Sequence, residues 1–106
     1  MATFFNQSVK NVSDVETQVL TSTSDSTIIL SILSANTDGA TASDISARRK
    51  DASSVDLGYL AFTVTIPADS NVELISNKYI LPSGHSINLQ SSQSGTIDAQ
   101  ISYVEV

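Results

Sequence analysis

The chain of 106 residues has no cysteine, which excludes disulfide bonds and every metal site built on thiolates. It has one histidine, His85, and a zinc site without thiols would need three or four nitrogen and oxygen ligands. A hydrolase of the Ser–His–Asp kind would also need His85, but no G-x-S-x-G motif occurs. We therefore expect no catalytic residue, no metal ligand and no cofactor, and we place His85 in a turn at a sheet margin.

Positive charge is scarce, with five Lys and Arg residues against eleven Asp and Glu residues and a net charge of −6. Nucleic-acid binding derives most of its affinity from cations that neutralise phosphates, so this acidic chain predicts no nucleic-acid partner. Anionic membranes repel the chain for the same reason. No apolar run approaches the ~20 residues of a membrane span, and the start lacks the pattern of a secretory signal. We expect no membrane partner and no export by the general secretory route.

Glycine and tryptophan are also sparse or absent. The four glycines, at positions 39, 58, 84 and 95, are too scattered to form a phosphate-binding loop, and each is expected at a turn or a bulge. There is no tryptophan, and the three tyrosines are far apart in the sequence, which argues against an aromatic platform for sugars. A carbohydrate-binding module stays an alternative. No D-x-D-x-D-G motif for calcium occurs among the aspartates.

The chain does contain a series of short segments rich in Ile, Val, Leu and Thr, separated by polar turns. The periodicity of amphipathic helices does not occur, so the pattern predicts an all-β fold. About eight short antiparallel strands, with turn signals every ~8–12 residues, predict a single β-sandwich or jelly-roll-like domain over residues 15–106. Residues 1–14 lack this pattern, and we expect an extended N-terminal arm there.

One expected strand alternates cleanly between apolar and polar residues. In "LGYLAFTVTIP", residues 57–67, this alternation predicts that Phe62 points into the core and that Tyr59 points outwards.

Another segment, "TIILSILSAN", is apolar in both phases of a strand, whereas a sandwich strand usually keeps one face polar. Its second face, with Ile29 and Leu33, must therefore be covered. Either Phe4, Phe5 and Val9 of the same chain cover it, or another subunit does, which would make the protein a homo-oligomer, a dimer or a trimer. On the second interpretation, replacing Ile29 or Leu33 with aspartate would give monomers.

The segment "ARRK" gathers three of the five cations, Arg48, Arg49 and Lys50. It has two interpretations, an exposed hairpin tip or a contact with an acidic neighbouring surface. Such a contact would weaken with salt, because exposed charges are screened beyond about 8–10 Å. The candidate protein-interface residues are Phe4, Phe5, Val9, Ile29, Leu33, Arg48, Arg49 and Lys50.

The order of segments resembles a known group of proteins. It runs from "ILSILSANTDG" through a polar strand and "IPADSNVELISNKYILPSGHSINLQSS" to a terminal "IDAQISYVEV". This layout resembles small virion structural proteins of marine tailed bacteriophages, including those that infect cyanobacteria. The resemblance covers nearly the whole chain, and its departures are the long polar run at 41–56 and the "ARRK" segment.

The resemblance implies a non-enzymatic β-sandwich on the outside of a virion, made in the host cytoplasm and present in many copies. The first expectation is a decoration or cement protein bound to the major capsid protein on the outer surface of the shell. The alternative is a structural protein of the neck, tail or fibre, bound to other virion proteins. A host-surface carbohydrate-binding module is a further alternative.

Overall fold

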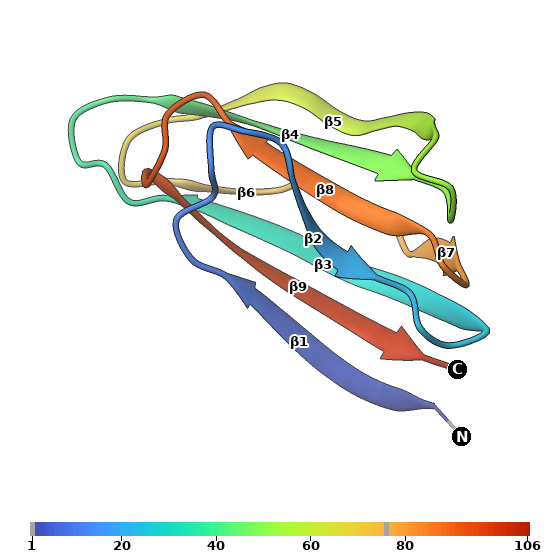
Figure 1. The fold of residues 1–106 in the computed structure, drawn as a ribbon. Coiled ribbons are helices and arrows are strands. Elements are labelled where there is room, and N and C mark those ends of the chain that lie inside the picture. Colours follow the sequence, from blue (N-terminus) through green and yellow to red (C-terminus); the bar gives the residue numbers. More distant parts are fainter. Residues whose placement is uncertain (1, 76) are drawn as a thin grey trace.

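The computed structural model describes residues 2–75 and 77–106, and its regular structure consists of β-strands (Figure 1). The strands are β1 (Thr3–Val9), β2 (Thr17–Thr21), β3 (Ser26–Asn36), β4 (Ser43–Lys50), β5 (Asp56–Ile66), β6 (Asn71–Glu73), β7 (Tyr79–Pro82), β8 (Ser86–Ser91) and β9 (Ile97–Glu105). The expected all-β class is confirmed. Over the same residues, the structure holds no helix with the length and apolar character of a membrane span.

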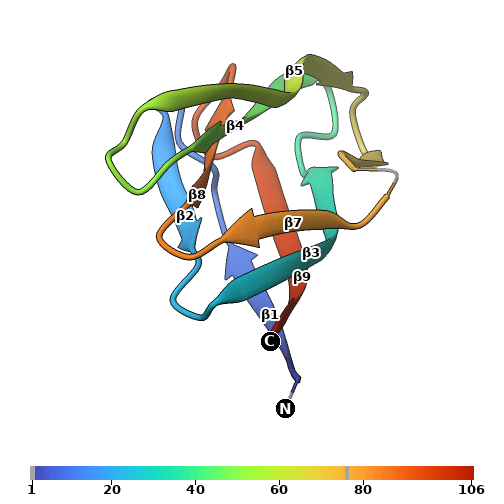
Figure 2. The same cartoon turned by 90° about the vertical axis from the view of Figure 1, so that its right-hand side faces the viewer.

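The strands form two antiparallel sheets that pack face to face, as the end-on view of Figure 2 shows. In sheet A the order is β1-β9-β3, and β6 and β7 both pair with β3; in sheet B the order is β2-β8-β4-β5. The chain passes from one sheet to the other at every connection except the β4–β5 hairpin and the link between β6 and β7. The expected sandwich is therefore confirmed, and its strand order is that of a jelly roll.

Strands β6 and β7 lie one after the other along the same edge of β3. The first pairs with Leu33–Ala35 of β3 and the second with Ser26–Ile29. Together they take the place of a single strand. This division explains why residues 2–75 and 77–106 form nine strands where about eight were expected.

The core lies between the two sheets and is almost entirely aliphatic. Most strands contribute one face to it, because side chains alternate along a strand, whereas the edge strand β1 contributes only Val9. Fully burying one such side chain contributes ~1.5–3 kcal/mol, so these residues supply most of the force that holds the sheets together. The buried members are Val12, Leu20, Ile29, Ile32, Ile45, Ala47, Ile66, Leu81, Ile87, Leu89, Ile97, Ala99 and Ile101.

The expected N-terminal arm over residues 1–14 is not confirmed. Met1 lies outside the described residues, and Thr3–Val9 forms β1, which pairs antiparallel with β9 from Thr3↔Glu105 to Val9↔Ala99. As an edge strand β1 is covered by little else, so its side chains need not alternate between apolar and polar. This is why residues 3–9 resemble an irregular segment in the sequence although they belong to the sheet.

A β-bulge in β3 explains why that strand is apolar in both phases. The pairing of β3 with β9 shifts between Ile29 and Ser31, so Leu30 is an extra residue. The shift exchanges the two phases halfway along the strand, and Ile29 and Ile32 both point into the core, where both are fully buried. Both sets of apolar residues therefore contribute to the same core, and a second subunit is not needed to cover the whole strand.

Strand β5 departs from the alternation expected of it. Its pairing with β4 shifts at three places, one of them opposite Ser46, where Phe62 and Thr63 form a bulge. The φ angle of Thr63 is 47°, and its N–H donates to the Ser46 hydroxyl (2.8 Å). The bulge turns Phe62 to solvent, with 62% of its surface exposed. The expectation that Phe62 lies in the core is therefore wrong, whereas Tyr59 points outwards as expected.

Candidate functional site

An apolar row crosses the outer face of sheet A. It consists of Phe4, Val104, Ile28 and Ile80, one residue from each of β1, β9, β3 and β7, which lie directly opposite one another in the register. Residues opposite each other on neighbouring strands are in side-chain contact on one face. The ends of this row are exposed, Phe4 by 75% and Ile80 by 62%, whereas Val104, between Phe4 and Ile28, is buried.

Most of the rest of the outer face of sheet A is polar, and Leu33 is an exposed apolar exception. The Asn6 amide donates to the Ser102 hydroxyl (3.2 Å), and the Ser8 hydroxyl donates to Gln100 Oε1 (2.7 Å). Farther along the sheet, Glu73 accepts from the Ser31 hydroxyl and from the backbone N–H of Ile32. The apolar row is therefore confined to the end of the sheet where both chain termini lie (Figure 1).

The candidate residues from β1 and β3 occupy different surroundings. Phe5 points to the inner face, stacks on Tyr103 with ring centroids 5.4 Å apart, and keeps 42% of its surface exposed. Val9 packs against the core. Ile29 is fully buried in its own chain, so a partner cannot reach it, whereas Leu33 is 40% exposed on the outer face of sheet A. The residue of β3 that belongs to the apolar row is Ile28.

Arg48 and Lys50 lie on the outer face of sheet B, where the chain itself supplies their acidic partners. Arg48 Nε is 3.0 Å from Glu16 Oε1, and a terminal nitrogen is 3.3 Å from Asp56 Oδ2. Lys50 Nζ is 3.1 Å from the other oxygen of Glu16. The hydrogen bond to the Tyr59 hydroxyl, together with the two carboxylates, raises the pKa of Arg48 above its ordinary value. The two cations therefore form an internal ion-pair cluster rather than a free basic tip.

Arg49 points the other way, between the two sheets at the end of the sandwich. One terminal nitrogen donates to the Tyr79 hydroxyl of sheet A (2.8 Å), and the other lies 2.9 Å from Nδ1 of His85. The turn at the hairpin tip is made by residues 51–55, beyond "ARRK". Strand alternation thus separates Arg49 from its two neighbours, which the sequence presents as one cluster.

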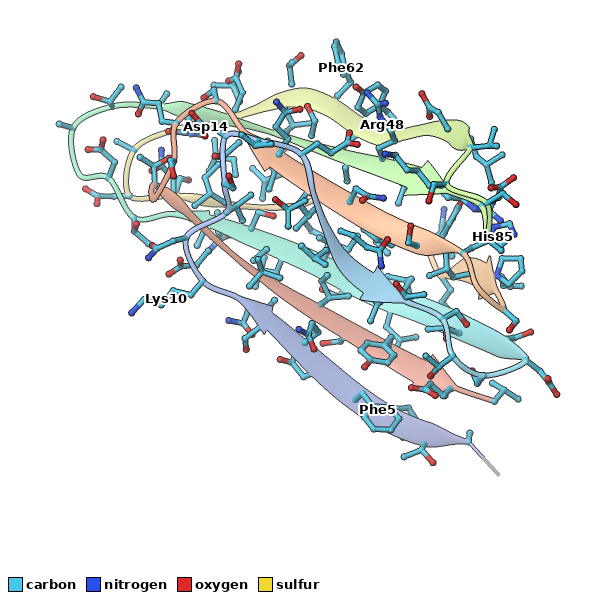
Figure 3. The ribbon with its side chains drawn as sticks, viewed as in Figure 1. Phe5, Lys10, Asp14, Arg48, Phe62 and His85 are labelled. Atoms are coloured by element: carbon cyan, nitrogen blue, oxygen red, sulfur yellow. The ribbon has the colours of Figure 1, made fainter. Side chains whose placement is uncertain are left out.

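A shallow hollow lies on the outer face of sheet B beside Phe62. Its volume is about 170 Å³, smaller than the ~300–1,000 Å³ of pockets for drug-sized ligands. Phe62 and Tyr59 pack with ring centroids 4.6 Å apart (Phe62 and Arg48 are labelled in Figure 3). The hollow is lined by Asp44, Ser46, Phe62, Thr63, Gln90, Ser91 and Ser92. No group of three or more potential metal-binding side chains occurs in residues 2–75 and 77–106.

Sequence reasoning missed Ile28, Ile80 and Phe62 as surface residues. The sequence groups Ile28 with Ile32, whereas the bulge after Ile29 puts these two residues on opposite faces. The row exists because β1, β9, β3 and β7 align in one register, which no local pattern reveals. Phe62 is turned outwards by a bulge that is defined by the pairing of β5 with β4, and the nearest signal in the sequence is Gly58, which has a φ angle of 112°. Both surfaces therefore depend on long-range pairing.

The fold of the chain is similar to segments of two solved viral structures. It matches a chain in the crystal structure of the infectious bursal disease virus VP2 subviral particle with a TM-score of 0.58 and 6% identity. It matches a chain in the crystal structure of the T13 infectious bursal disease virus particle with a TM-score of 0.57 and 4% identity. Each match covers 98% of this chain but only 33% and 31% of the viral chains, respectively. At such low identity the similarity concerns the fold alone.

No protein-family model and no curated protein sequence matches the chain.

Proposed function

We propose that this protein is a non-enzymatic virion structural protein, and more specifically a decoration protein that binds the outer surface of a capsid shell through the apolar row. The observation that carries the proposal is the row itself, a band of large apolar side chains on a sheet face that is mostly polar apart from Leu33. Apolar surface of this kind, rimmed by polar residues, is typical of protein-interaction sites. Burying one such side chain stabilises a complex by ~1.5–3 kcal/mol, so Phe4 and Ile80 are the strongest candidates for contact.

The likeness to capsid-particle chains supports the choice of partner. Jelly rolls occur in viral capsid proteins, in lectins and in cupins, so the fold leaves several classes of function open. The match over 98% of this chain to segments of particle-forming proteins favours the first class. The order of sequence segments, which resembles small virion proteins of marine tailed bacteriophages, favours attachment to a virion of that kind. A position on the neck, tail or fibre is the alternative within the same class.

Weak binding by each copy is sufficient for such a role. The apolar row, with one residue from each of four strands, offers less contact area than a standard interface, which buries ~800 Å² on each partner. Contacts to several shell subunits add through effective concentration, so a shell with many equivalent sites is covered even when one contact alone is weak. The internal ion pairs of Arg48 and Lys50 leave little role for salt-sensitive attachment at that cluster.

The test compares two substitutions on opposite faces of the sandwich. Ile80→Asp alters the apolar row, and Phe62→Asp alters sheet B at a residue with the same exposed fraction, 62%. Purified variants are mixed with capsids that lack the protein, and bound copies are counted by mass spectrometry. We expect Ile80→Asp to reduce binding at least about tenfold, because an ionised side chain would have to be desolvated in the contact, and Phe62→Asp to bind like the wild type.

Equal binding of both variants would exclude the apolar row as the attachment surface. In native virions, a copy number that scales with the major capsid protein identifies a shell protein. A copy number far below that of the capsid protein would favour the neck, tail or fibre instead.

The hollow beside Phe62 favours a second candidate function, the binding of a glycan. Gln90 Nε2 donates to the Asp14 carbonyl oxygen and Asp44 Oδ1 accepts from the Thr65 hydroxyl, while Gln90 Oε1 and Asp44 Oδ2 take part in no hydrogen bond within the described residues. Such groups beside an exposed ring suit a single sugar residue. Phe62→Ala should then abolish binding on a glycan array. An array with no hits for the wild type would exclude this function.

A further inference from the structure

Among the sheet edges that residues 2–75 and 77–106 form, β1 is the one that carries none of the usual protection against pairing with another chain. Edge strands are usually shortened, bulged, charged or interrupted by proline. Strand β5 has three register shifts, β2 has one, and the opposite edge of sheet A is divided into two short strands, of which β7 ends in Pro82. Strand β1 has seven residues in unbroken register with β9, and it has no charge and no proline.

The free edge of β1 is also accessible. Its side chains are exposed on both faces except for Val9, so sheet B does not cover this strand. Figure 3 shows Phe5 at this rim of the sandwich. One side of the Phe5 ring stacks on Tyr103, and 42% of the residue surface is exposed. The strand therefore presents unpaired backbone groups together with an aromatic ring that is only half covered.

We propose that β1 pairs antiparallel with β1 of a second copy of this chain, with the two-fold axis at Phe5. This register places Phe5 opposite Phe5 of the partner, and Thr3 opposite the partner's Gln7. In this register each residue of β1 lies opposite a partner residue that is an even number of positions away in the sequence. Side chains that point to the same face of the sheet therefore lie opposite each other. The ring pair Tyr103–Phe5 then continues into its symmetry mate as a ladder of four aromatic rings, which covers the exposed part of Phe5.

The lack of charge on β1 allows a second copy of this acidic chain to approach along this edge. The chain carries −6, so most of its surface repels a second copy. The uncharged β1 brings no like charges face to face, whereas β5 begins with Asp56 and β2 is preceded by Glu16. A two-fold contact through the same strand is closed and self-complementary, which is the commonest symmetry of soluble oligomers. It stops at two copies and leaves no further edge of this kind.

The dimer would also enlarge the surface that docks on a capsid, and this consequence rests on the proposed function. A two-fold axis through the β1 pair is perpendicular to the sheet, so both outer faces of sheet A lie on the same side. The Phe4 residues become diagonal neighbours, about two residues apart, or roughly 7 Å along the strands. The two apolar rows then form one nearly continuous band across both copies, and a dimer presents twice the docking area of a monomer.

The association is tested on the purified full chain without any particle. A contact through one strand per copy buries less than the ~800 Å² of a standard interface, so sedimentation is followed from about 10 µM to about 1 mM. We expect a monomer–dimer equilibrium. The variant Thr3→Glu/Gln7→Glu places like charges opposite each other twice and should weaken the dimer at least about fivefold. The variant Thr3→Lys/Gln7→Glu places opposite charges at the same two positions and should retain it.

Gln93→Glu/Gln100→Glu is the control for total charge, because it adds the same two negative charges at exposed positions outside β1. It should dimerise more strongly than Thr3→Glu/Gln7→Glu. A chain that stays monomeric throughout, or an equal loss of dimer in these two variants, would overturn the proposal. Growth beyond the dimer would overturn it too, since β1 pairing is closed.

The register has its own test, which the absence of cysteine makes clean. A mixture of the single variants Thr3→Cys and Gln7→Cys should form disulfide-linked dimers faster than either variant alone. Equal rates in all three samples would exclude the register centred on Phe5. If the chain is monomeric and the β1 amides gain protection from hydrogen exchange only on capsids, β1 pairs with a capsid strand and the second-copy proposal is wrong. Loss of capsid binding by an intact dimer would instead exclude the proposed function alone.

Discussion

Arg49 illustrates how much of this small sandwich is fixed by single side chains. Its guanidinium bridges the two sheets by donating to the Tyr79 hydroxyl and by contacting Nδ1 of His85. A guanidinium has donors only, so Nδ1 of His85 must act as the acceptor. His85 therefore has a structural role at the end of the sandwich, in agreement with its expected position in a turn.

This geometry predicts the tautomer of His85. The neutral ring should carry its proton on Nε2, because Nδ1 accepts from Arg49. Nitrogen-15 NMR of the imidazole ring distinguishes the two tautomers directly. In Arg49→Met, which removes the donor, we expect a mixture of tautomers. A wild-type ring protonated mainly on Nδ1 would contradict the contact.

Asp51 gives a prediction for pH. Hydrogen bonds from the backbone N–H groups of Val55 and Ser53, with a smaller effect of nearby His85, lower the pKa of Asp51 below its ordinary value of 3.8. A group whose pKa is lowered by folding stabilises the fold at pH above its ordinary pKa, and this stabilisation is lost as the pH falls through the lowered value. Urea unfolding should therefore show Asp51→Asn less stable than the wild type at neutral pH. The difference should shrink below pH 3.8; a constant difference would contradict this account.

At the scale of elements, register decides which residues reach the surface. The sequence predicts most of the strands, because turn residues and apolar segments are local signals, but it does not predict β1. It does not predict the bulge after Ile29, because the extra residue is defined only by the pairing of β3 with β9. The apolar row has the same origin. Phe4 and Ile80 are far apart in sequence, and they belong to one row because β9 and β3 pair in register between β1 and β7.

Because of the bulge in β3, aspartate substitutions at Ile29 and Leu33 should differ in their effect on stability. Ile29→Asp should unfold the chain, because it places a carboxylate at a fully buried position without a partner. Leu33→Asp should leave the fold intact and change the free energy of unfolding by less than about 1 kcal/mol, because Leu33 is on the outer face. Circular dichroism and urea unfolding measure both. Similar losses in the two variants would mean that β3 has no bulge.

Ile29→Ala gives the milder form of the same test. Removing a buried isoleucine side chain typically costs about 2–5 kcal/mol in the free energy of unfolding, and Leu33→Ala should cost much less. Both variants should keep the association behaviour of the wild type, since neither residue lies in β1. This outcome differs from the sequence-based hypothesis that either position controls the oligomeric state.

At the scale of the whole molecule, the jelly roll joins segments that are distant along the chain. Strand β1 pairs with β9, and β3 pairs with β6, β7 and β9. Folds dominated by such pairings fold slowly, because long loops must close before the contacts form. We expect refolding in about milliseconds to seconds, followed by tyrosine fluorescence in stopped flow, since the chain has no tryptophan. Refolding within microseconds would contradict the topology.

The adjacency of Thr3 and Glu105 in the sheet has a practical consequence for anyone who labels this protein. A fluorescent protein or purification tag fused at either end would sit next to Phe4 and Val104 and would shield them from any large assembly. The hairpin turn at 51–55 joins β4 and β5 of sheet B, away from β1 and β9, and is exposed at its tip (Figure 1). Cargo intended for display is therefore better inserted there than attached to the ends.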